Sequence, residues 1–104
     1  MDYRVVVTAE AEKDLNGFVQ YLFFAKKNMQ AAKNVLDDFA DTIEILKRVA
    51  GSLKICENSR LQSLGYRRIN FQKHRYFILY RIEDDVVYVD DIFHELQDYE
   101  NRMI

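Results

Sequence analysis

The chain has 104 residues and a formal net charge of −2, and 49% of its residues are hydrophobic, 31% are charged and none is proline. This length allows one modest core, and this balance excludes a disordered or fibrous chain. One cysteine, Cys56, leaves no partner for an internal disulfide, which is typical of a reducing compartment. The first residues do not resemble a signal peptide, and no apolar run approaches the roughly 20 residues of a membrane span. We therefore expect a single cytoplasmic domain over residues 1–104, with no membrane partner.

The first half of the chain predicts one strand followed by two helices. Residues 3–7 are β-branched and nearly all apolar, which indicates a buried strand. Thr8 can cap a helix whose apolar residues recur at helical spacing to about residue 25. After a polar turn at residues 26–28, a second apolar stripe runs from Ala32 to Ala50, and Gly51 follows it. The two stripes predict a long helical hairpin that packs against a sheet.

The second half of the chain changes to strand-like patterns. Residues 66–71, 75–82 and 86–93 are rich in β-branched and aromatic residues, and short links join them. These segments predict an antiparallel meander, followed after residue 94 by a short helix or tail. The fold class is therefore α+β: a two-layer domain with an N-terminal strand and a long helical hairpin packed on an antiparallel sheet.

Charge is distributed unevenly along this second half. Residues 60–81 contain no Asp or Glu, whereas residues 83–100 contain no Lys or Arg. One interpretation is a basic working surface on an acidic body. The alternative is that two solvated strands of opposite sign pair across a hairpin. Under the first interpretation the candidate nucleic-acid-binding residues are Arg60, Arg67, Arg68 and Lys73.

Several kinds of site are excluded by the residues that are missing. The three glycines lie far apart, so no glycine-rich phosphate loop exists. There is no HExxH motif and no paired-cysteine site, and the chain has only two histidines. We expect no metal and no cofactor.

An arginine and a histidine are predicted to meet at one edge of the meander. A two-residue turn at residues 84–85 would place Arg75 opposite His94, and a three-residue turn would place it opposite Phe93. Either register brings the guanidinium and the imidazole to the same edge. Arg81 shares strand parity with Arg75, so both are expected to project from one face.

This pair suits the chemistry of phosphodiesters. A guanidinium can hold a phosphate and stabilise charge that develops on it, and an imidazole can move a proton near neutral pH. With RNA the 2′-hydroxyl could act as nucleophile without a metal. Glu57 is a candidate base, and Tyr99 is a candidate for base stacking or proton transfer. A lone histidine at a strand end is more often structural, so catalysis by His94 rests on its pairing with Arg75.

Three segments resemble toxins of the RelE/ParE superfamily. Residues 64–82 are similar to the strand-rich half of these toxins, residues 87–99 to their last strand and a following histidine, and residues 7–15 to their strand-to-helix start. The resemblance covers nearly the whole chain in matching order. It implies a type II toxin that is neutralised in a hetero-oligomer by a cognate antitoxin, whose helix or strand wraps the toxin.

The superfamily has two branches with different targets. In the branch that cuts mRNA inside the ribosome, a Glu, an Arg and a His carry catalysis; Arg75 and His94 match the latter two, and Glu57 matches the first loosely. The ParE branch poisons DNA gyrase and is not known to cleave RNA. The long hairpin and acidic net charge resemble ParE, whereas the concentrated arginines resemble the nucleases. This comparison favours ribosome-dependent mRNA cleavage, with gyrase inhibition as the alternative.

Overall fold

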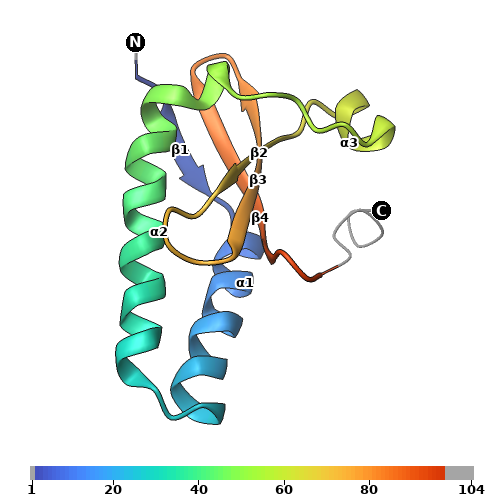
Figure 1. Ribbon diagram of the computed structural model, residues 1–104. Helices are drawn as coiled ribbons and strands as arrows, with labels where there is room; N and C mark the ends of the chain where they lie inside the picture. The colour runs from blue at the N-terminus through green and yellow to red at the C-terminus, as the bar shows by residue number, and fades with distance from the viewer. Residues whose placement is uncertain (1, 98–104) are drawn as a thin grey trace.

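The computed structural model describes residues 2–97, and its order of elements follows the predicted order (Figure 1). Residues 98–104, with the predicted Tyr99, lie outside the described part. No helix in the described part is long and apolar enough to cross a membrane. The elements are β1 (Arg4–Val7), α1 (Ala9–Gln20), a π-helical turn (Tyr21–Ala25), α2 (Met29–Val49), a 3₁₀ turn (Ala50–Ser52), α3 (Ser59–Ser63), β2 (Arg67–Asn70), β3 (Tyr76–Glu83) and β4 (Val86–His94).

The four strands form one mixed sheet in the order β1-β4-β3-β2. Strands β2, β3 and β4 make the predicted antiparallel meander. β1 adds to it in parallel with β4, and Val7 pairs with Val89. Thr8 ends this pairing, because its N–H and its hydroxyl both donate to the Val89 carbonyl, at 3.0 and 2.9 Å, while its hydroxyl oxygen caps α1. The two-layer α+β prediction is confirmed, with β1 making the sheet mixed.

The helical hairpin covers one face of the sheet and forms the main core (Figure 1). Both helices present the apolar stripes that their sequences predict. The Tyr80 hydroxyl is fully buried here and donates to the Ala50 carbonyl at 2.8 Å, which ties β3 to the end of α2. The buried members of this core are Ala11, Leu15, Val35, Leu46, Ala50, Ile69, Phe71, Ile78, Tyr80, Val87, Val89 and Ile92.

The other face of the sheet carries a second, smaller core. The segment between α2 and β2, which includes the short helix α3, contributes Cys56 and Leu61. These side chains pack on Phe77, Leu79 and Phe93 of β3 and β4. The sequence patterns did not predict α3.

A β-bulge changes the register at the end of the meander where Arg75 and His94 lie. The turn at Asp84–Asp85 has two residues, and Asp84 has the positive φ of 56° that such hairpin turns require. The register shifts between Leu79 and Tyr80 and leaves Asp90 without a partner on β3, so Tyr76 pairs with His94. Both predicted registers are therefore wrong at this end.

Candidate functional site

Arg75 and His94 lie at the same end of the β3–β4 ribbon, but their side chains are not joined. Arg75 precedes β3, its side chain is exposed, and its carbonyl accepts the Glu95 N–H at 2.9 Å. The His94 ring stands edge-on to the Tyr76 ring, with 5.2 Å between the centroids. Its Nδ1 accepts the Leu96 N–H at 3.2 Å, which places the proton of a neutral ring on Nε2. Within residues 2–97 no hydrogen bond or ring contact links Arg75 to His94.

No hydrogen bond, ion pair or ring contact joins Glu57 to these two residues within the described part of the chain. Glu57 is exposed and lines an open groove of about 560 Å³ between the segment 53–58 and strand β2. The basic residue on the β2 side of this groove is Arg68, and Asn70 lies beside it. Neither Arg75 nor His94 lines this groove.

Arg81 is held in an ion-pair network on the sheet face away from the hairpin. Its Nε donates to Asp90 at 2.7 Å and its Nη1 donates to Glu83 at 2.6 Å. Asp90 also accepts the Tyr66 hydroxyl at 2.9 Å. The hydrogen bond to Asp90 raises the pKa of Arg81, and burial together with Asp90 raises the pKa of Tyr66 to about 12. At Arg81 the charges of β3 and β4 therefore pair across the hairpin, as expected under the interpretation that two strands of opposite sign pair with each other.

The predicted nucleic-acid-binding residues divide into two groups. Arg60 on α3 and Lys73 before β3 are exposed. Arg67 donates from its Nη1 to the carbonyl oxygen of Leu53. Arg68 stacks on the Phe77 ring, 3.7 Å from its centroid, and donates to Asn70 at 3.0 Å. Arg67 and Arg68 therefore make contacts within the protein, whereas the side chains of Arg60 and Lys73 are exposed.

A buried carboxylate that the sequence patterns did not predict, Asp38 on α2, holds the loop before β3. Its side chain is 1% exposed and accepts the N–H groups of Gln72 and Lys73 at 3.0 and 2.9 Å. The Nδ1 of His74 lies 2.7 Å from the same carboxylate. Burial alone would raise the pKa of Asp38, but the hydrogen bonds from His74 and the two amides outweigh it and lower that pKa. The sequence does contain a signal for this residue, because Asp38 lies three residues after Val35 and so falls on the apolar face of the helix, where a carboxylate needs a partner.

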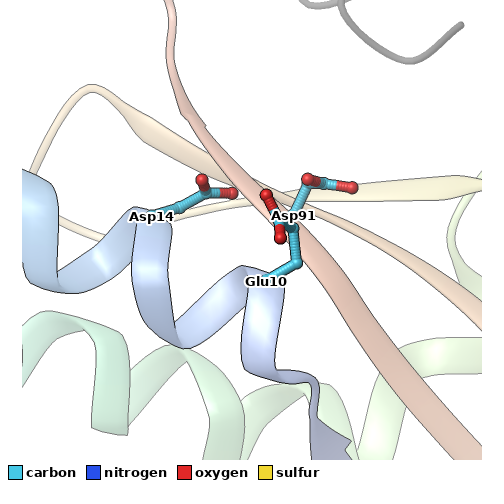
Figure 2. Close-up of side chains that lie close together, drawn as sticks. All are labelled: Glu10, Asp14 and Asp91. Atoms are coloured by element: carbon cyan, nitrogen blue, oxygen red, sulfur yellow. The ribbon is translucent and has the colours of Figure 1, made fainter.

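Three carboxylates also gather where α1 passes β4 (Figure 2). Glu10 and Asp14 are one turn apart on α1, Asp91 is on β4, and one oxygen of each lies within 4.8 Å of the others. Asp14 accepts the Ile92 N–H at 3.0 Å. Carboxylate oxygens are the ligands of hard divalent cations, and a bound proton relieves the same repulsion. Burial and the neighbouring carboxylates raise the pKa of Asp91 to about 7, which suits a proton at this position.

The fold and the order of its elements are those seen in toxin–antitoxin structures of the RelE/ParE superfamily. The model of one family, the ParE toxin of type II toxin–antitoxin systems, matches residues 5–99, so the chain belongs to that family. Among solved structures, the chain resembles a chain in the structure of the chromosomal ParDE toxin–antitoxin system from P. aeruginosa, with a TM-score of 0.70. The sequence identity is 16%, and the match covers 88% of this chain and 95% of that chain. It also resembles a chain of the RelBE2 toxin–antitoxin complex of Mycobacterium tuberculosis, with a TM-score of 0.51 and 20% identity over 90% of this chain and 99% of that one. No curated protein sequence matches the chain significantly.

Proposed function

We propose that this toxin is a non-enzymatic inhibitor of DNA gyrase that a cognate antitoxin neutralises. The observation that carries the proposal is the match of residues 5–99 to the ParE toxin family, the branch that poisons gyrase. The two similar structures come from toxin–antitoxin systems, which supports an antitoxin partner for this chain as well. This order of preference reverses the one drawn from the sequence, which placed mRNA cleavage first.

The geometry of the predicted nuclease residues supports this order. Metal-free RNA cleavage needs a base and a phosphate-binding cation around one phosphate. Here Glu57 lines a groove that neither Arg75 nor His94 lines, and Tyr76, not Arg75, stands opposite His94. Arg81 is paired with two carboxylates. The net charge of −2 also supports a protein target more than ribosomal RNA.

The test has two parts, one that measures supercoiling by purified gyrase and one that measures precursor incorporation in living cells. We expect the toxin to block supercoiling by gyrase, and its induced expression to stop thymidine incorporation before methionine incorporation. The Arg75→Ala and His94→Ala variants should still arrest growth, because neither residue would perform chemistry. Early collapse of protein synthesis, with loss of arrest in both folded variants, would establish the mRNA nuclease and the ribosome as its partner instead.

A further inference from the structure

The end of the helical hairpin exposes an unusual set of large apolar side chains. We name residues 21–29, the connection between α1 and α2 together with the first residue of α2, the hairpin tip (Figure 1). Within it Tyr21, Phe23, Phe24 and Met29 are 55%, 40%, 68% and 67% exposed. Leu22 alone of this tip packs against the main core. Exposed apolar groups that are clustered, unlike scattered ones, mark surfaces that bind partners.

The backbone of the tip holds these rings in a defined arrangement. Residues Tyr21–Ala25 form a π-helical turn, in which the Lys26 N–H donates to the Tyr21 carbonyl at 3.1 Å. Such turns are rare and occur frequently at functional sites. The Phe23 and Phe24 rings meet edge to face, with centroids 4.9 Å apart. The two rings therefore present a preformed protrusion whose ordering on binding costs little.

The charge of the tip differs in sign from that of the molecule. Residues 15–36 include Lys26, Lys27 and Lys33 but no Asp or Glu, in a chain whose net charge is −2. The Lys26 ammonium lies over the Tyr21 ring, 5.7 Å from its centroid. Lys33 pairs with Asp37 at 3.2 Å, so the lysines next to the rings are Lys26 and Lys27. A partner that complements this surface carries acidic side chains around an apolar pocket.

We propose that the hairpin tip is the surface with which this toxin binds its protein target, in an apolar pocket of that target rimmed by Asp and Glu. The identification of the target as gyrase rests on the function proposed above. Paired aromatic rings held at a fixed angle suit a pocket on a folded protein, where aromatic anchors contribute most of the binding energy. The adjacent lysines strengthen attraction to an acidic rim and speed the encounter at low salt.

The test uses two variants of the tip and two controls of matched chemistry. Phe24→Ala removes an exposed ring, and Lys27→Glu reverses a charge. Leu64→Ala and Lys54→Glu change an apolar and a basic residue that are exposed elsewhere. We expect each tip variant to bind purified gyrase about tenfold more weakly than wild type, and to lose growth arrest, with the thermal unfolding midpoint unchanged. Both controls should match wild type.

The outcomes separate this proposal from the proposed function. A wild-type toxin that arrests growth without affecting gyrase refutes gyrase as target, and loss of arrest in the tip variants still supports the tip. Full arrest by both folded tip variants overturns the tip proposal. The tip proposal is also overturned if the only property that the tip variants lose is binding to phosphatidylglycerol vesicles or binding to the antitoxin. The same holds if the only change is in the oligomeric state.

Discussion

Asp38 shows how one residue determines where a loop lies. Its carboxylate is the acceptor for two backbone amides and is in contact with His74, and all three groups belong to the loop between β2 and β3. That loop also carries the exposed cations Lys73 and Arg75. Loss of any of these contacts would leave a buried charge less well satisfied, which costs stability.

We expect Asp38→Asn to lower the free energy of unfolding by about 2 kcal/mol, since hydrogen bonds to a charged group contribute more than neutral ones. Urea unfolding at pH 7 measures this change. Because the folded-state pKa of Asp38 is lowered, its contribution is present above the unfolded-state pKa and is lost as pH falls through the folded-state value. The difference between wild type and variant should therefore shrink below about pH 4.

The neighbouring residue provides the control. Asp37 is exposed and pairs with Lys33 at 3.2 Å. Asp37→Asn should change the unfolding free energy by less than about 0.5 kcal/mol. Equal effects of the two substitutions would show that Asp38 does not anchor the loop.

At the scale of elements, the sequence predicted the helices and strands but not how they meet. Periodicity located the hairpin and the three meander strands, because each depends on local spacing. At the bulge, the Asp90 side chain contacts Arg81 and Tyr66, and no local pattern reveals these contacts. This one extra residue places Tyr76 opposite His94, so the predicted cross-strand pairing of Arg75 with His94 is wrong, although both residues lie at the same end of the ribbon. The groups around Asp38 and Asp91 were missed for the same reason, since their partners are distant in sequence.

The junction of α1 with β4 should make stability depend on pH. The pKa of Asp91 is raised to about 7 in the folded state, against about 4 when unfolded. The folded protein therefore binds the extra proton between these values. The contribution of Asp91 to the free energy of unfolding is therefore fully present below about pH 4, and it is lost as pH rises through 7. We expect Asp91→Asn, whose amide can donate to Asp14 as a protonated acid does, to stabilise the protein at pH 8 by of the order of 2 kcal/mol.

Unfolding measured at pH 5 and pH 8 checks this expectation. The gain from Asp91→Asn should be smaller at pH 5, where wild-type Asp91 retains its proton. Asp85→Asn, at an exposed position in the hairpin turn, should show no such dependence. A wild-type stability that rises between pH 5 and pH 8, with Asp91→Asn following it, would contradict the raised pKa.

At the scale of the molecule, the sheet separates two cores of unequal size. The larger lies under the hairpin, and the smaller lies under the segment 53–66. Phe77 of β3 belongs to the smaller core and its neighbour Ile78 belongs to the larger. Successive residues of this strand therefore pack in opposite cores, which couples the two. Arg67 adds a polar link, because its guanidinium bonds the carbonyl of Leu53. These links predict that both cores unfold together.

Leu61 offers the test of this cooperativity. It is fully buried in α3, and Leu61→Ala should lower the free energy of unfolding by about 3 kcal/mol with a single transition. Far-ultraviolet circular dichroism, which follows the helices, and tyrosine fluorescence should report the same urea midpoint. Leu64→Ala is the matched control, because Leu64 is 56% exposed and its loss should cost less than about 0.5 kcal/mol. If Leu61→Ala leaves the helical transition of the hairpin unchanged, the segment 53–66 folds as a separate unit, and the groove beside Glu57 can open while the hairpin stays folded.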